Sequence, residues 1–352
     1  MLSYKVWAVA LGLLIAARVP VAHTAHAQEP LSASEQTLYE AAKAKNESVT
    51  WYSSHYSVET AEALGKGFQQ RYPGVPINVV RTTAQVAFQR LNQDLAANVH
   101  QCDVFSSTDL GHYTVLKAKN MLAKFTPEAA AKAHPEFQKL DPDGYFHVTS
   151  AGLVLINYNK QKLEGKELPR KWSDLLDPKW KDQVTVGHPG YSGYVGTWVV
   201  MMKELYGWDY FKKLEVNKPQ IGRSINDTVT MLTSGERSIG AGPSATTLQS
   251  AAKGNPVGVI YPEDGAILMI APSAVLEKSK NPNAARLMME FLLSIEASKI
   301  NVNEFNEPIR VEVPPAAGGK PLSEVKTIRP TFEVVEKGMP EVKELWRETF
   351  GI

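Results

Sequence analysis

Strands and helices alternate in the part of the chain around residues 48–105, and this alternation constrains the fold more than any other feature of the sequence. Short runs rich in β-branched and aromatic residues are followed by segments with apolar residues at helical spacing, as at Val58, Ala61 and Leu64. The expected order is a strand over 48–52, a helix over 58–71, a strand over 76–80, a helix over 86–99 and a strand that begins at Asp103. This order predicts a parallel, doubly wound α/β sheet.

Polar side chains follow each of these three strands. Ser53, Ser54 and His55 come after the first strand, Arg81 comes after the second, and Ser107 comes after the third. Ligands of such sheets bind beyond the carboxyl ends of the strands, so we expect these side chains to line a ligand site. The Arg81 guanidinium can hold an oxyanion through two hydrogen bonds, with a surface position as the alternative. For His55 the alternatives are a hydrogen-bonding histidine and a metal ligand.

The alternation restarts after residue 144 and predicts a second α/β unit. Further strands are expected over 151–158, 183–186, 219–222, 237–241, 256–261 and 266–270, and helices near 196–206, 227–234 and 280–298, with a charged helix at the end of the chain. A chain of 352 residues exceeds one typical core, which favours two domains. We therefore predict two doubly wound α/β lobes joined by a hinge, with lobe 1 formed by 28–146 and 263–320 and lobe 2 by 147–262 and 321–352.

The first 27 residues have the pattern of a secretory signal peptide. Lys5 precedes a short apolar run over 6–17, and residues 25–27 supply an A-x-A cleavage signal. The apolar run is too short to cross a bilayer, and no later segment of the sequence approaches that length. The alternatives are a membrane anchor and a buried first helix. We expect cleavage after Ala27 and a periplasmic mature protein.

The composition argues against several classes of protein. A formal net charge of +1 provides no basic excess for binding nucleic acid or a membrane surface. The single cysteine, Cys102, excludes an intrachain disulfide and any CxxC metal or redox motif. HExxH, P-loop and GxGxxG motifs are absent from the sequence.

The stretch GHPGYSGYVGTW, residues 187–198, joins an expected strand to an expected helix. Glycine permits a close backbone approach to an oxyanion, and the first N–H groups of a helix favour negative charge. We expect the N–H groups of Ser192, Gly193 and Tyr194 to bind an anion in the cleft between the lobes, with an ordinary capped turn as the alternative. Arg223 lies at another strand-to-helix turn, and it either faces the cleft or pairs with Asp227.

The same stretch also raises the possibility of a serine hydrolase. Residues 190–194 read GYSGY, which differs from the nucleophile elbow G-x-S-x-G only at Tyr194. A hydrolase of that kind needs a histidine downstream of the serine, but His188 precedes Ser192 and no histidine follows it. We therefore expect a binding protein and not an enzyme.

The block WSDLLDPKWK, residues 172–181, precedes an expected strand and is accompanied by shorter motifs. These are TWYSSH at 50–55, DVFSS at 103–107, SGE at 234–236, YPEDG at 261–265 and NPNAA at 281–285. Together they resemble the periplasmic solute-binding proteins of ABC importers, specifically the extracellular solute-binding family that includes ferric-ion binders. The resemblance implies two lobes that close on a ligand, delivery of the ligand to an inner-membrane permease, and no catalysis.

The resemblance also bears on metal binding. Ferric members of the family hold iron through a histidine after the first strand, a glutamate after the third and a tyrosine pair in the second lobe. His55 falls at the histidine position, but residues 106–109 read SSTD without a glutamate, and residues 241–247 read AGPSATT without a tyrosine. Serine and threonine hydroxyls do not replace phenolates as ferric ligands, so we expect no metal and no cofactor.

These observations predict a type II periplasmic binding protein for a small organic anion that is phosphorylated, phosphonate-bearing or carboxylated. It is expected to act as a monomer and to have an ABC permease as partner, without nucleic acid. Ferric iron transport, a signalling role without transport and, more weakly, a hydrolase based on Ser192 are the alternatives. Glu263 lies near the expected crossover between the lobes, where a hinge turn is its alternative role. The candidate ligand-binding residues are Ser53, Ser54, His55, Arg81, Ser107, Ser192, Gly193, Tyr194, Arg223, Ser244 and Glu263.

Overall fold

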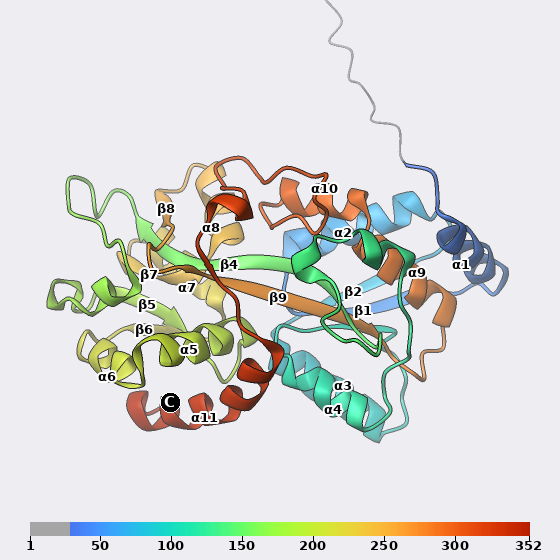
Figure 1. The fold of residues 1–352 in the computed structure, drawn as a ribbon, viewed down its shortest axis with the longest axis horizontal. Coiled ribbons are helices and arrows are strands. Elements are labelled where there is room, and N and C mark those ends of the chain that lie inside the picture. The colour runs from blue at the N-terminus through green and yellow to red at the C-terminus, as the bar shows by residue number, and fades with distance from the viewer. Residues whose placement is uncertain (1–28) are drawn as a thin grey trace, which may run out of the picture. The chain divides into compact units, whose positions relative to one another are not determined.

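A ten-stranded sheet runs through the protein, for which a computed structural model describes residues 29–352 (Figure 1). The predicted signal peptide lies outside the described residues. The strands are β1 (Val49–Ser53), β2 (Ile77–Arg81), β3 (Val104–Ser106), β4 (His147–Asn159), β5 (Val184–Gly187), β6 (Gln220–Gly222), β7 (Ile239–Pro243), β8 (Val257–Ile260), β9 (Ala266–Val275) and β10 (Thr327–Ile328). The helices are α1 (Ala33–Ala44), α2 (Val58–Arg71), α3 (Ala84–Ala96), α4 (Gly111–Ala118), α5 (Gly193–Tyr206), α6 (Asp209–Val216), α7 (Ile225–Thr233), α8 (Ser244–Ala252), α9 (Pro282–Leu292), α10 (Ile295–Asn303) and α11 (Phe332–Phe350).

Two long strands, β4 and β9, connect two groups of shorter parallel strands (Figure 1). The sheet order is β2-β1-β3-β9-β4-β7-β5-β6. Strand β1 pairs in parallel with β2 and β3, and β5 pairs in parallel with β6 and β7, whereas β9 is antiparallel to both β3 and β4. We call the β1–β3 group with its helices lobe 1 and the β5–β7 group with its helices lobe 2. The expected α/β fold with two lobes is confirmed.

The elements of lobe 1 form where the residue pattern predicts them. Helix α2 has the expected bounds, and the Ser57 hydroxyl accepts a hydrogen bond from the N–H of Thr60 at 3.1 Å. Strands β1, β2 and β3 each begin one residue after the expected position. Helix α3 begins two residues earlier than expected, at Ala84, and ends at Ala96.

The single helix expected over 280–298 is wrong, because the structure has two helices there. Helix α9 ends at Leu292, and α10 begins at Ile295. The Ser294 hydroxyl accepts a hydrogen bond from the N–H of Ala297 at 3.0 Å and so caps the second helix. A serine N-cap satisfies a first-turn N–H and starts a new helix even where the apolar periodicity continues.

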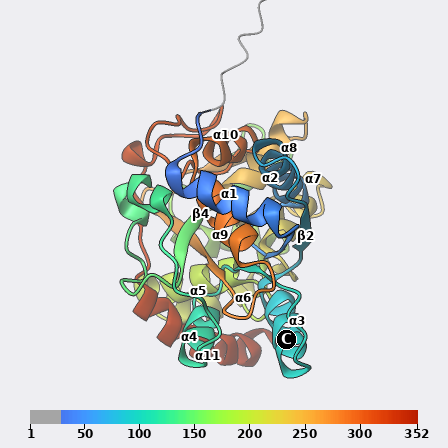
Figure 2. The same cartoon turned by 90° about the vertical axis from the view of Figure 1, so that its right-hand side faces the viewer.

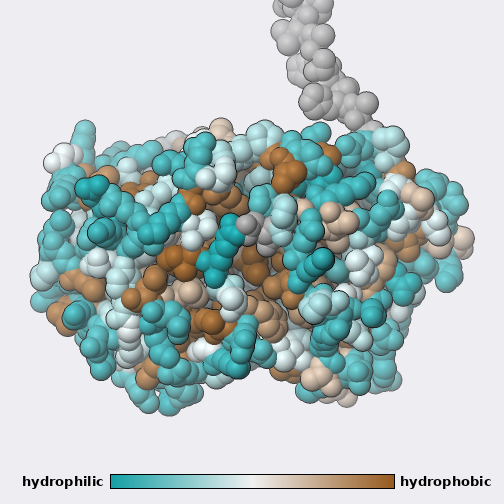
Figure 3. Space-filling model, viewed as in Figure 1, coloured by the Kyte–Doolittle hydropathy of each residue, from teal (hydrophilic) through white to brown (hydrophobic). Residues whose placement is uncertain are grey.

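Each lobe has its own apolar core. Phe68 and Phe291 are buried in lobe 1, where α1 lies against α9 (Figure 2). Trp198 and Phe211 are buried in lobe 2 together with Trp346, through which α11 packs against this lobe. Hydrophilic side chains cover most of the face in Figure 3, and the apolar ones gather near its middle. Within residues 29–352, no helix has both the length and the apolar character needed to cross a membrane.

Candidate ligand-binding site

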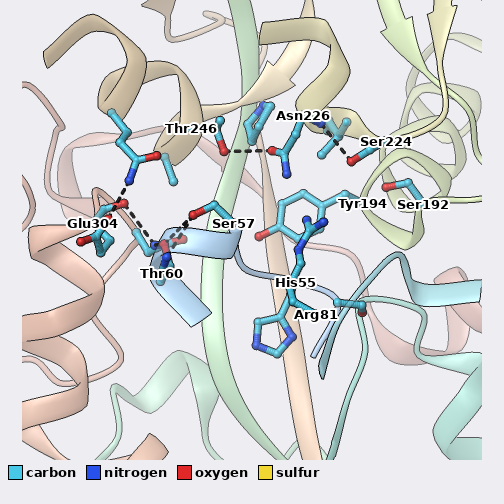
Figure 4. Close-up of a pocket in the computed structure, with 16 residues that line it drawn as sticks. His55, Ser57, Thr60, Arg81, Ser192, Tyr194, Ser224, Asn226, Thr246 and Glu304 are labelled. Carbon is cyan, nitrogen blue, oxygen red and sulfur yellow. Dashed lines mark hydrogen bonds between the residues drawn. The ribbon is translucent and has the colours of Figure 1, made fainter. Parts of the chain in front are cut away.

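A polar pocket lies between the two lobes, close to the carboxyl ends of β1, β2, β5, β6 and β7 (Figure 4). In this conformation the cavity that the pocket encloses is about 30 Å³. Its walls consist of Ser54, His55, Ser57, Thr60, Arg81, Ser192, Tyr194, Ser224, Ile225, Asn226, Pro243, Ala245, Thr246, Gln249, Glu304 and Asn306. Both lobes therefore contribute to one site.

Four helices begin at this pocket. Helix α2 begins after Ser57, α5 after Ser192, α7 after Ser224 and α8 after Pro243, and all four of these residues line the pocket. The three serine hydroxyls each accept a hydrogen bond from a first-turn N–H, which holds the helix starts in place. The remaining N–H groups and the positive ends of the helix dipoles favour negative charge. The helix starts thus favour an anion in the pocket.

Arg81 supplies the cationic side chain of the pocket. It ends β2, and its Nε donates a hydrogen bond to the Tyr56 carbonyl oxygen at 2.8 Å, which orients the guanidinium. Burial lowers the pKa of Arg81, while the charges of Glu59 and Asp227 raise it. An arginine keeps its charge in proteins, and no described carboxylate forms an ion pair with this one. The two terminal nitrogens are therefore available to a ligand.

His55 lies beside Arg81 as a neutral side chain. Burial, together with the charge of Arg81, lowers the pKa of His55 to about 3. Neither ring nitrogen has a hydrogen-bond partner within the described residues, so the imidazole offers one donor and one acceptor to a ligand. Within residues 29–352, no three His, Cys, Asp or Glu side chains gather closely enough to hold a metal ion.

The Ser192 turn differs in one respect from the expectation. The N–H of Ser192 donates to the His188 carbonyl oxygen at 3.1 Å, so this N–H does not face a ligand. The Ser192 hydroxyl accepts a hydrogen bond from the N–H of Val195 at 3.5 Å as the N-cap of α5. The N–H groups without a helical acceptor are those of Gly193 and Tyr194, the first two residues of the helix.

Gly193 lies at a contact between the lobes and not in the pocket wall. A Cβ atom at this position would stand 2.5 Å from the carbonyl carbon and from Oγ1 of Thr108, and 2.6 Å from the N of Asp109. These atoms belong to the loop between β3 and α4 in lobe 1. Only glycine allows the start of α5 to approach this loop so closely.

Three of the predicted serines are buried outside the pocket wall. Ser53 is fully buried, and its hydroxyl has no partner among the described residues. The Ser107 hydroxyl hydrogen-bonds with His112 Nδ1 at 2.8 Å, and both side chains are buried away from the pocket. The Ser244 hydroxyl accepts a hydrogen bond from the N–H of Leu153 at 3.4 Å, although its neighbours in α8 line the pocket.

Two predicted charged residues are exposed and do not line the pocket. The guanidinium of Arg223 lies 4.9 Å from the centre of the Tyr191 ring, in a cation–π contact. Glu263 forms an ion pair with Arg170. Neither residue is in position to contact a ligand in this conformation.

The surroundings of Ser192 do not resemble those of a catalytic serine. No histidine accepts a hydrogen bond from its hydroxyl among the described residues. The closest histidine in sequence, His188, accepts the N–H of Gly190 at its Nδ1, at 2.8 Å. A nucleophilic serine requires a base within hydrogen-bond reach.

Several pocket residues were not predicted from the sequence. Ser57 and Ser224 follow strands and cap helices, and this position is the signal that would have identified them. Thr60, Asn226 and Thr246 lie in the first turn of their helices and Gln249 in the second turn of α8. Helical spacing alone does not reveal which of these side chains meet a ligand. Glu304 and Asn306 follow α10, outside all the motifs, and no local signal marks them.

Two α/β lobes, joined by two strands that run from one lobe to the other, with a polar pocket between the lobes, define the class of periplasmic binding proteins. The family comparison agrees. The chain belongs to the family of bacterial extracellular solute-binding proteins, whose profile matches residues 102–331, more than half of the chain.

Solved structures share this fold at low sequence identity. The periplasmic binding protein AfuA from Actinobacillus pleuropneumoniae, solved with fructose-6-phosphate bound, has a TM-score of 0.78 and 21% identity, and the match covers 87% of this chain and 99% of AfuA. Iron-bound HitA from Pseudomonas aeruginosa has a TM-score of 0.74 and 22% identity over 86% of this chain and 99% of HitA. A relative from Salmonella paratyphi A, provisionally named as a 2-aminoethylphosphonate-binding periplasmic protein, is 26% identical over 56% of this chain and 60% of its own length.

Proposed function

We propose that this protein is the periplasmic substrate-binding component of an ABC importer and that it captures a small organic anion between its lobes. The observation that carries the proposal is the convergence of four helix starts and the unpaired Arg81 on one pocket. The pocket recognises a phosphate, phosphonate or carboxylate group, and Ser54, His55, Arg81, Ser192 and Tyr194 contact the ligand. The protein acts as a monomer that delivers the ligand to an inner-membrane permease, and it catalyses no reaction.

The names of similar proteins support a phosphorus oxyanion. Fructose-6-phosphate and 2-aminoethylphosphonate, which appear in those names, differ in their organic parts but share this group. The proposal is tested by a thermal-shift screen of organic phosphates, phosphonates and carboxylates, followed by calorimetric titration. A ligand present at 100 times its Kd adds about 2.7 kcal/mol to the free energy of unfolding. Stabilisation by neutral or cationic solutes alone would contradict the proposal.

The proposed mechanism is closure of the lobes about β4 and β9, the two strands that connect them. Residues 1–27 act as a signal peptide, and the lobe boundaries follow the division predicted from the sequence. Closure removes water from the pocket, which strengthens each charge-assisted hydrogen bond to the ligand. A permease can then distinguish the closed, liganded form from the open one.

An ion pair between the lobes provides a test of closure. Lys343 of α11, which packs against lobe 2, lies 3.3 Å from the buried carboxylate of Asp109 in lobe 1. Replacing Lys343 with methionine is expected to weaken anion binding by about 1.4-fold to fivefold, because one partly exposed ion pair contributes about 0.2–1 kcal/mol to the closed form. Small-angle scattering should show a larger radius of gyration for the ligand-free variant.

Lys337 offers a matched control for this variant. It lies on the same helix, but it pairs with Glu333 of that helix and is exposed. Lys337→Met should therefore leave both the affinity and the scattering curve unchanged. Equal effects of the two substitutions would show that helix charge, and not a contact between the lobes, is responsible.

Ferric iron transport is the alternative that iron-bound HitA raises. Tyr194 is the one tyrosine in the pocket wall, and burial raises its pKa, which disfavours the phenolate that binds Fe(III). We expect no visible phenolate-to-iron absorption band when ferric citrate is added to the protein. A purple complex with one iron per chain would overturn the organic-anion proposal.

A further inference from the structure

The pocket contains one acidic side chain, Glu304, in addition to the cationic Arg81. These two are the charged residues of the pocket wall, since His55 is neutral. One carboxylate oxygen of Glu304 accepts a hydrogen bond from Gln249 Nε2 at 2.6 Å, and no ion pair involves Glu304 among the described residues. Arg81 is not its counter-ion, because the acidic groups that raise the pKa of Arg81 are Glu59 and Asp227.

The fold places Glu304 apart from Arg81 in the pocket. In Figure 4, Glu304 and Thr60 lie on one side, Arg81 and His55 lie near the middle, and Ser192 and Ser224 lie on the other side. Ser192 and Ser224 mark helix starts, and Thr60 lies in the first turn of α2, but Glu304 directly follows the last residue of α10, Asn303. The end of a helix carries partial negative charge, which adds to the charge of the carboxylate. The pocket therefore holds a positive charge at Arg81 and, apart from it, a negative charge at Glu304.

From this polarity we infer that the natural ligand is zwitterionic, with a cationic amine opposite its anionic group, and that Glu304 selects the amine. The inference rests on the proposed function, because it concerns the same pocket. A ligand with an anionic group alone would leave the Glu304 carboxylate desolvated on closure without a cationic partner, which is unfavourable. An ammonium group donates three hydrogen bonds and satisfies the free oxygen of Glu304. Asn306, whose Nδ2 donates to Thr60 Oγ1 at 3.3 Å, lies next to this carboxylate and completes that side of the pocket.

The inference is tested with pairs of ligands that differ in the amine. The pairs are aminomethyl-, 2-aminoethyl- and 3-aminopropylphosphonate against the alkylphosphonates of equal length, and β-alanine against propionate. Calorimetric titration of the wild-type protein should give an affinity about tenfold to a hundredfold higher for the best amine than for its partner without the amine. Glu304→Gln should remove most of this ratio, because the amide keeps the shape of the side chain but loses the charge.

Glu263→Gln is the matched control, since Glu263 is exposed, ion-paired with Arg170 and outside the pocket wall. It should leave the ratio unchanged. The inference would be overturned by equal affinities for both members of every pair, or by stronger binding of hydroxylated phosphates than of any amine. Either result would leave the proposed function standing. A preference for the amine-bearing ligands that persists in Glu304→Gln would also overturn the inference. Failure of the wild-type protein to bind any of these anions would instead refute the proposed function itself.

Discussion

Replacing Gly193 with valine is expected to abolish ligand binding while the fold remains intact. The Cβ of valine would stand 2.5 Å from the carbonyl carbon of Thr108, so the closed arrangement of the lobes could not form. Backbone atoms cannot rotate away, and overpacking of this kind costs about 1–3 kcal/mol or more. Since the clash is between the lobes, opening relieves it and the core of each lobe is unaffected. We expect the affinity to fall by at least about 100-fold in calorimetric titration, with an unchanged circular dichroism spectrum.

Two further variants sharpen this experiment. Thr108→Ala should not restore binding to the Gly193 variant, because the atoms in contact include the carbonyl carbon of Thr108 and the N of Asp109. Gly319→Val adds the same side chain in a loop where the nearest atom to the Cβ is 3.2 Å away, and it should leave binding unchanged. Wild-type affinity in Gly193→Val would show that the turn is only a connector and that closure does not bring α5 against this loop.

Arg81→Met is expected to reduce anion affinity by at least about 100-fold. The substitution keeps the apolar length of the side chain but removes the one cationic side chain of the pocket wall. Each hydrogen bond between charged groups contributes about 1.5–3 kcal/mol, and a guanidinium forms two with an oxyanion. The affinity of Arg81→Lys should lie between those of the wild-type protein and Arg81→Met, because lysine retains the charge without the planar guanidinium group. The measurement is calorimetric titration with the best anion of the screen.

Arg223→Met is the matched control for this prediction. Arg223 is also an arginine at a strand-to-helix turn, but it lies over the Tyr191 ring and outside the pocket wall. We expect its replacement to change the affinity by less than about threefold, in line with the small contribution of exposed charges. If Arg223→Met were the more damaging variant, the anion would have to bind outside the pocket described here.

More of the predicted residues that line the pocket lie in lobe 1 than in lobe 2. Ser54, His55 and Arg81 were predicted as candidates because the residues after parallel strands meet at one edge of a sheet, and all three line the pocket. Ser53 and Ser107 follow the same rule, but their side chains point into the protein interior. A strand alternates its side chains between two faces, and the residue pattern at a strand end does not reveal which face is covered.

The local elements were determined by the sequence alone. Apolar spacing and the Ser57 cap define α2 to the residue, since periodicity and capping act within a few residues of the chain. The break between α9 and α10 escaped that reasoning, because the apolar pattern runs through it. Tertiary structure alone decided that Glu304 and Arg81 line the same pocket and that Gly193 touches Thr108. These contacts join segments far apart in the chain, and they depend on how the two lobes pack about β4 and β9, which no local pattern encodes.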